Sequence, residues 1–268
     1  MTDTWTLTTP PTAEPIDAIE AKLHLRVDTT ADNTLIGILI AMARRYCEGV
    51  QGRRYVTQTW QLLRDNFARV MVLPGAPLQS VSSITYIDTA SASQTLTATL
   101  YDVDTTTEPG QVVQGYNDTY PTVRGHHQDV AINYVCGYLT PITSTFATDL
   151  LTASGRTFTD ADIIRLSNSG GALPAPLAAY TDYHVRDVSG STFKLAATAG
   201  GAAVTLTDDG TGTHFVGVLP EPMRQAMLLL IGHLYEHREA ATDGQAITNV
   251  PLAVESLLQM QRLFPAVL

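Results

Sequence analysis

The stretch LIGILIAMARRYCEGV, residues 35–50, decides how the rest of the sequence is interpreted. Its apolar residues recur at helical spacing, but they form two stripes, whereas an amphipathic surface helix needs only one. The first stripe comprises Leu35, Ile38, Leu39, Met42 and Tyr46, and the second comprises Ile36, Ile40, Ala43, Cys47 and Val50. Two stripes predict burial on both sides of this helix, either inside the fold or against a neighbouring subunit.

Helical patterns lie on both sides of a long β-rich region. Residues 1–54 are expected to be helical, with a first helix starting near Thr12 and the double-striped helix over residues 32–50. After Pro220, which suits a first helical turn, apolar residues again recur at helical spacing. A last helix is expected to start near Pro251.

The region between these helices alternates between apolar and polar residues, which is typical of strands. Strands are expected at residues 56–62, 70–73, 81–87, 96–103 and 129–136. Residues 140–217 are rich in Thr, Ser, Ala and Gly, with strands expected at 162–166, 183–187, 192–196 and 204–207.

The predicted fold class is therefore α+β. A helical body with a small antiparallel sheet is formed by residues 1–139 and 218–268. An inserted all-β domain, a sandwich or a barrel, occupies residues 140–217 and interrupts that body.

Composition limits the function classes. Of 268 residues, 44% are hydrophobic and 16% charged, so the chain can form a core and is not expected to be disordered. The net charge of −10 argues against a sequence-reading nucleic-acid binder, although a protein that lets DNA pass remains compatible with it. The first residues lack the pattern of a secretory signal, and no apolar run is long enough to span a bilayer. Cys47 and Cys136 are expected to be buried free thiols.

One motif points to a metalloenzyme. His233, Glu236 and His237 match H-x-x-E-H, in which two histidines one helical turn apart bind zinc and the glutamate acts as base. A third ligand would have to come from Glu239 or Glu255. The alternative is an exposed helix end, where histidine favours the negative C-terminus. We expect the helix end, and no metal or other cofactor.

Four other groups of residues carry both a functional and a structural interpretation. For a metal site at His126, His127 and Asp129, a phosphate loop at residues 210–214 and a calcium site at Asp208 and Asp209, the structural alternative is a loop or turn. The arginines at one helix end suit either an acidic partner or pairs within the chain: Arg44, Arg45, Arg53 and Arg54.

An ordered set of short stretches resembles the head–tail connector (adaptor) family of long-tailed bacteriophages. In the first part of the chain these are residues 21–28 (AKLHLRVD), 39–48 (LIAMARRYCE), 56–60 (VTQTW) and 73–86 (LPGAPLQSVSSITY). In the last part they are residues 220–226 (PEPMRQA), 234–240 (LYEHREA) and 250–258 (VPLAVESLL). Family members resemble this chain at Leu-Tyr-Glu without needing both histidines, which favours the helix end over the zinc site.

The segment 140–217 departs from that family, in which the chain passes quickly from the sheet to the last helices. It is similar instead to a small β-module found among phage structural proteins. The matching residues are Leu173-Pro174, 180–183 (YTDY), 192–195 (TFKL) and 206–214 (LTDDGTGTH).

The resemblance implies a structural role without enzymatic activity. Twelve copies are expected to form a ring under the portal, and the ring would extend the DNA channel to a stopper, tail-terminator or other neck protein. DNA would pass without sequence-specific binding and no membrane would be involved. The protein is expected in the virion neck after synthesis in the bacterial host cytoplasm.

Two sets of residues are the candidates for these contacts. The subunit interface is expected at Leu35, Leu39, Met42, Arg44 and Arg45 on the double-striped helix. Portal contact is expected at the apolar C-terminal segment, through Arg262, Leu263, Phe264 and Leu268.

Two other functions remain open. In one, segment 140–217 is a glycan-binding or adhesin-type domain, which would need exposed aromatic side chains. We expect most of its aromatic residues to lie in the core instead: Phe146, Phe158, Tyr180, Tyr183, Phe193 and Phe215. In the other, the chain is a zinc peptidase that uses the H-x-x-E-H motif.

Overall fold

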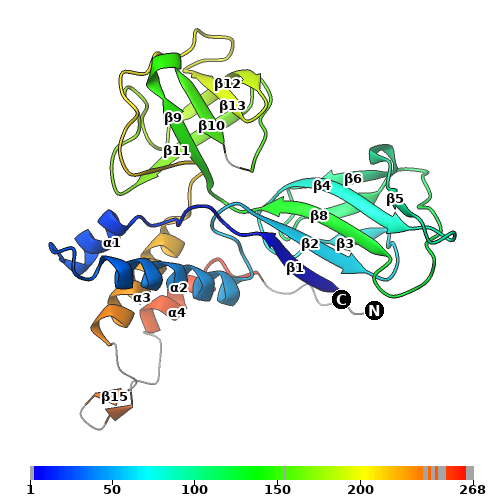
Figure 1. Cartoon of the computed structure of the whole chain (residues 1–268), viewed down its shortest axis with the longest axis horizontal. Helices are drawn as coiled ribbons and strands as arrows, with labels where there is room; N and C mark the ends of the chain where they lie inside the picture. Colours follow the sequence, from blue (N-terminus) through cyan, green and yellow to red (C-terminus); the bar gives the residue numbers. More distant parts are fainter. Residues whose placement is uncertain (1–2, 154, 238–240, 243–244, 247–251, 264–268) are drawn as a thin grey trace. The chain divides into compact units, whose positions relative to one another are not determined.

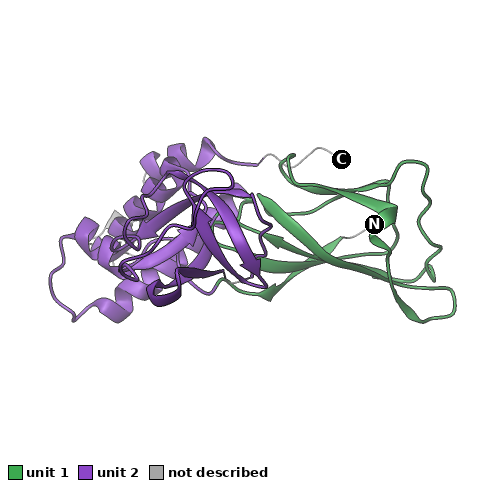
Figure 2. Cartoon of the chain, turned by 90° about the horizontal axis from the view of Figure 1, so that it is seen from above, with its two compact units in different colours: residues 1–11, 52–138 green, residues 12–51, 139–268 purple. Residues whose placement is uncertain are grey.

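The computed structural model describes residues 3–153, 155–237, 241–242, 245–246 and 252–263. By its internal contacts the chain forms two compact units, which Figure 2 colours separately. Unit 1 comprises residues 1–11 and 52–138, and unit 2 comprises residues 12–51 and 139–268. The fold is α+β, and every strand pairing within its sheets is antiparallel.

Unit 1 consists of two antiparallel sheets. The first has the order β1 (Thr4–Thr9), β2 (Gln58–Arg64), β8 (Val130–Cys136), β4 (Leu78–Ile87), β5 (Ser93–Thr95). The second has the order β3 (Val70–Val72), β7 (Gln111–Gln114), β6 (Tyr101–Asp104), and a 3₁₀ turn at Ala98–Leu100 precedes β6.

One core joins these two sheets. Leu62, Ile84 and Ile132 from the five-stranded sheet are fully buried in one cluster with Met71 and Val112 from the three-stranded sheet. Side chains alternate across each strand, so each sheet contributes every second residue to this core. The two sheets therefore form a small sandwich.

The described parts of unit 2 contain four helices: α1 (Ala18–Leu25), α2 (Asn33–Gln51), α3 (Glu221–Glu236) and α4 (Leu252–Gln259). Helix α2 contacts each of the other three. The side chain of Asp17 caps α1 by accepting a hydrogen bond from the Ile19 amide, and Pro222 lies in the first turn of α3. Two short strands follow α3: β15 (Ala241–Thr242) and β16 (Gln245–Ala246).

Unit 2 also contains a closed six-stranded β-barrel (Figure 1). Its strands are β9 (Thr140–Thr145), β10 (Leu150–Ala153), β11 (Ile163–Ser169), β12 (Asp182–Ser189), β13 (Thr192–Ala196) and β14 (Thr213–Val216), and a 3₁₀ turn at Phe146–Thr148 links β9 to β10. Leu151, Leu166, Val185 and Phe193 fill its interior. Closure leaves the barrel without an edge strand.

Some sequence expectations were wrong in detail. The N-terminal region is not all helical, because residues 4–9 (TWTLTT) form β1, as their β-branched and aromatic content favours. Helix α1 begins at Ala18 and not near Thr12. Of the strand expected over residues 96–103, only residues 101–103 are strand, because a 3₁₀ turn at Ala98–Leu100 precedes β6. Residues 204–207 form no strand.

The domain boundaries drawn from the sequence stay a prediction. The sequence grouped the helices with the sheet and set residues 140–217 apart, whereas the contacts group the helices with the barrel. Independent folding of segment 140–217 stays a prediction.

Among the residues described, no helix combines the length and the apolar character needed to span a bilayer. Cys47 and Cys136 are both buried, as expected.

Candidate interaction surfaces

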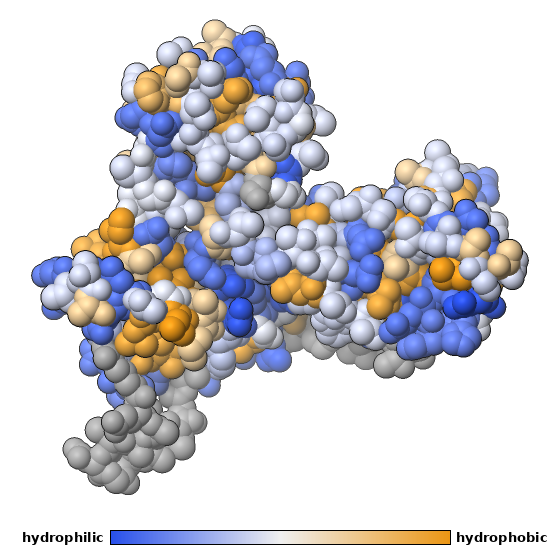
Figure 3. All heavy atoms as spheres, viewed as in Figure 1, coloured by the Kyte–Doolittle hydropathy of each residue, from blue (hydrophilic) through white to orange (hydrophobic). Residues whose placement is uncertain are grey.

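Helix α2 buries one of its two apolar stripes and exposes much of the other. Ile36, Ala43 and Cys47 of the second stripe are fully buried. Ile38, Met42 and Tyr46 of the first stripe, spaced four residues apart, remain 54%, 50% and 39% exposed. We call these three residues the α2 outer face. Hydrophobic residues gather over the helices in the space-filling view (Figure 3).

The residues expected at the subunit interface divide between the two sides of α2. Met42 and Arg45 are exposed, and Leu35 is half-buried. Leu39 and Arg44 are only 6% and 5% exposed, so they stabilise the chain's own unit. Any contact between copies at this helix therefore depends on Arg45 and the α2 outer face, which includes Met42.

Arg44 is the centre of a buried ion-pair cluster. Its Nε and Nη2 atoms donate to the two carboxylate oxygens of Glu14 at 2.6 and 3.0 Å, and Nη1 donates to Glu48 at 3.0 Å. Burial alone would lower the pKa of Arg44, but the two carboxylates outweigh it and raise the pKa. The cluster fixes the segment before α1 against α2.

Two of the other three arginines of the predicted cluster, Arg53 and Arg54, also have partners within the chain. Arg53 pairs with Glu108 at 2.7 Å and donates to the Tyr138 hydroxyl at 2.7 Å. The guanidinium of Arg54 lies 4.6 Å from the ring centroid of Trp60. Of the four arginines, Arg45 is the exposed one. The other three interact with groups of the same chain, so they mainly stabilise the fold.

A polar cluster connects the barrel to α1 and α3. The amide of Asp17 donates to Ser169 Oγ at 2.7 Å, and its carboxylate accepts from Thr213 Oγ1 at 3.1 Å. Ser169 also donates to Glu20, which pairs with Arg224 at 2.7 Å. Sequence reasoning missed this cluster, because its members come from three distant segments and no local spacing marks them.

The H-x-x-E-H residues lie where α3 ends. Glu236 is the last helical residue, and His237 follows it with a non-helical backbone. The amide of His237 donates to the His233 carbonyl at 3.0 Å, and the two imidazole rings lie 4.7 Å apart. Within the described parts of the chain, no three His, Cys, Asp or Glu side chains are grouped as a metal site. This arrangement closes the last turn of a helix.

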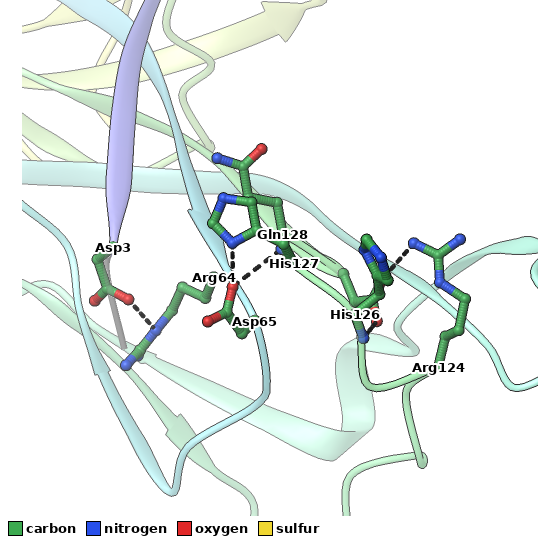
Figure 4. A network of polar contacts seen from close by, with 8 residues as sticks. Asp3, Arg64, Asp65, Arg124, His126, His127 and Gln128 are labelled. Atoms are coloured by element: carbon green, nitrogen blue, oxygen red, sulfur yellow. Dashed lines mark hydrogen bonds and ion pairs between the residues drawn. The ribbon is translucent and has the colours of Figure 1, made fainter.

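His126, His127 and Asp129 belong to a loop that hydrogen bonds hold closed (Figure 4). The buried Asp129 accepts from the His126 amide at 2.6 Å and from Arg124 at 2.7 Å. Burial favours its neutral form, but these hydrogen bonds outweigh burial and lower its pKa. His127 lies 2.8 Å from Asp65. These contacts support the loop interpretation.

The glycines of residues 210–214 allow this loop to contact the backbone of residues 169–171 closely. A Cβ on Gly212 would lie 2.4 Å from the Ser169 carbonyl oxygen and 2.8 Å from the Gly171 amide nitrogen. Asp208 accepts hydrogen bonds from the amides of Ala175 and Gly210, and Asp209 accepts one from Phe146. The motif is thus a site of close backbone contact, and both aspartates hold turns.

Four of the six aromatic residues in segment 140–217 are buried: Phe158, Tyr183 and Phe193 lie in the core of the barrel, and Phe215 of β14 is buried as well. Phe146 and Tyr180 are exposed. Most of these rings therefore fill the core, as expected.

The residues expected to contact the portal are only partly described. Arg262 is exposed, and Leu263 is half-buried, with its amide donating to the Gln51 carbonyl at the end of α2 at 2.9 Å. Phe264 and Leu268 lie outside the described residues.

No protein-family model and no curated protein matches the sequence. Three solved structures contain a chain that matches over 98% of this chain and 95% of its own length. They are the neck of an empty GTA particle computed with C6 symmetry (TM-score 0.54, 16% identity) and the virion of a native gene transfer agent (GTA) particle (0.53, 16%). The third is the neck of a native GTA particle computed with C12 symmetry (0.50, 15%). The similarity is one of fold over almost the full length.

Proposed function

We propose that this chain is a structural, non-enzymatic head–tail connector in the neck of a tailed phage or phage-like particle. The observation that carries the proposal is the similarity of fold with chains from neck structures, which spans 98% of this chain. Such a match takes in the helices, the sandwich and the barrel together. The sequence resemblance to connector proteins of long-tailed phages supports the same role independently.

The proposed assembly is a ring of identical subunits, twelve in number, placed under the portal. Symmetric rings close heterologous contacts, and each copy then covers a surface that a single chain leaves exposed. The α2 outer face is such a surface. DNA passes through the ring without specific contacts, and the net charge of −10 would help it slide.

The test of this role is the mass of the purified protein, measured alone and with its portal. A species near twelve subunits in either condition supports the ring. A monomer that also ignores the portal would overturn the proposal.

Met42→Asp is expected to prevent ring assembly while the chain still folds. Met42 is 50% exposed, so the new carboxylate stays hydrated in the monomer but would be buried and unpaired between subunits. Ile163→Asp is the matched control, because Ile163 is 63% exposed on the barrel strand β11. Light scattering should find monomers for Met42→Asp and rings for the control. If both variants formed rings, the α2 outer face would be excluded as the contact between subunits.

Deleting residues 262–268 is expected to abolish portal attachment and leave the ring intact. This segment is the proposed portal contact, and Leu263 carries a backbone hydrogen bond to the end of α2. A shorter deletion of residues 264–268 keeps that bond, so it separates loss of docking from weaker helix packing. Co-sedimentation with the portal measures attachment. Unchanged attachment of both truncated proteins would refute the portal contact.

A further inference from the structure

The strand β1 buries none of its residues. All six residues from Thr4 to Thr9 are exposed, whereas β2, β8 and β4 of the same sheet each contain buried residues. β1 lies at the edge of the five-stranded sheet (Figure 1). Among the described residues it pairs only with β2, so one row of its backbone N–H and C=O groups has no partner strand there.

Two apolar side chains of β1 lie on the core side of the sheet but are only partly covered by the rest of the chain. Trp5 lies opposite Leu62, and Leu7 lies opposite Trp60. Directly paired residues point to the same face of a sheet, and Leu62 is fully buried in the sandwich core. Trp5 and Leu7 therefore point to the core side of the sheet, yet they remain 50% and 40% exposed.

This edge has few of the features that normally prevent strands from pairing between molecules. Natural edge strands are short, charged, bulged or interrupted by proline. β1 has six residues with neither a charge nor a proline, and its one protective feature is a β-bulge or irregularity between Leu7 and Thr9, near its end. The other sheet edges in the described parts of unit 1 are better protected: β5 and β3 have three residues each, and β6 carries Asp102 and Asp104.

Charge favours a second copy of this chain as the partner. Two copies that each carry −10 repel one another wherever their acidic surfaces meet. β1 is uncharged, and the neighbouring Asp3 pairs with Arg64 at 3.1 Å (Figure 4). The edge is thus a place where two acidic copies can approach without local repulsion.

We propose that β1 is a strand-docking edge, which pairs through its free backbone groups with a strand of a neighbouring copy of this chain. The added strand would extend the sheet and cover Trp5 and Leu7. The identity of the partner rests on the proposed ring, whereas the edge itself follows from β1 alone.

The test compares Leu7→Lys with Thr95→Lys in the full-length protein, alone and on the portal. Leu7→Lys places a charge on the core side of the docking edge, and Thr95→Lys adds the same charge to the exposed edge strand β5 of the same sheet. Because both positions are exposed, both variants should fold with the far-ultraviolet circular dichroism of the native chain. Sedimentation velocity measures association, and hydrogen exchange reports protection of the residue 4–9 amides.

We expect Leu7→Lys to raise the dissociation constant between copies at least tenfold, and Thr95→Lys to change it less than twofold. Assembly should also slow amide exchange in residues 4–9 of the native chain. Equal association of both variants, with native rings intact, would overturn the docking edge and leave the proposed function standing. Protection of β1 only when the portal is added would show that the partner is a different protein. Monomers under every condition would overturn both proposals.

Discussion

Arg44→Ala is expected to lower the free energy of unfolding of unit 2 by about 3 kcal/mol, because two carboxylates, Glu14 and Glu48, would lose the charged group that binds both of them in a buried cluster. The side chains of Arg44 and Glu48 are only 6% and 7% exposed, so Glu48 would lose a charge partner in a place that water scarcely reaches. The segment before α1 would also lose the bidentate bond between Arg44 and Glu14. Urea unfolding followed by the helical circular dichroism signal measures the loss.

Arg45→Ala is the matched control for this change. Arg45 is the next residue on the same helix and is exposed, so its replacement should cost less than about 0.5 kcal/mol. Arg44→Lys should recover only part of the loss, because an ammonium group cannot bind the Glu14 carboxylate through two parallel hydrogen bonds. Equal stability of the two alanine variants would contradict the structural role of the cluster.

Gly212→Ala is expected to destabilise the barrel by about 3 kcal/mol or more. Gly212 has a φ of +78°, which costs an L-residue about 1 kcal/mol or more. The larger contribution is steric, because the new Cβ would lie 2.4 Å from the Ser169 carbonyl oxygen. That atom belongs to the backbone and cannot move aside as a flexible side chain would. Hydrogen exchange of the barrel amides measures the loss.

Gly190→Ala separates the two contributions. Gly190 also has a positive φ, +61°, but a Cβ there meets nothing within 4 Å. Its replacement should therefore cost only the backbone strain of about 1 kcal/mol. A similar loss in both variants would mean that the contact between residues 169–171 and the Gly212 loop does not stabilise the barrel.

Local pattern was sufficient for several elements. The spacing in residues 35–50 predicted a helix with two apolar sides, and α2 buries one side while Ile38, Met42 and Tyr46 stay exposed. Alternation predicted β8, and Pro220 with the apolar residues after it predicted α3. These successes share a cause, since the period of apolar residues follows directly from helix and strand geometry.

Local pattern failed where neighbours in space determine the outcome. The composition of TWTLTT favours a strand, but β1 depends on β2, which lies more than fifty residues later in the chain. Sequence spacing alone does not show that α3 ends at Glu236 and that His237 follows it with a non-helical backbone. Arg44 and Arg45 are alike in sequence, and only packing distinguishes the buried arginine from the exposed one.

The sequence by itself determined the fold class and the order of helices, sheet and β-rich segment. It also determined the acidic net charge and the two apolar stripes on the helix over residues 35–50. Tertiary structure decided that the β-rich segment closes into a barrel, that Asp17 and Glu20 connect it to the helices, and that β1 presents a free edge. The physical reason is one of range. Periodicity and composition act between residues a few positions apart, whereas closure, ion pairing and edge exposure depend on which distant segments meet.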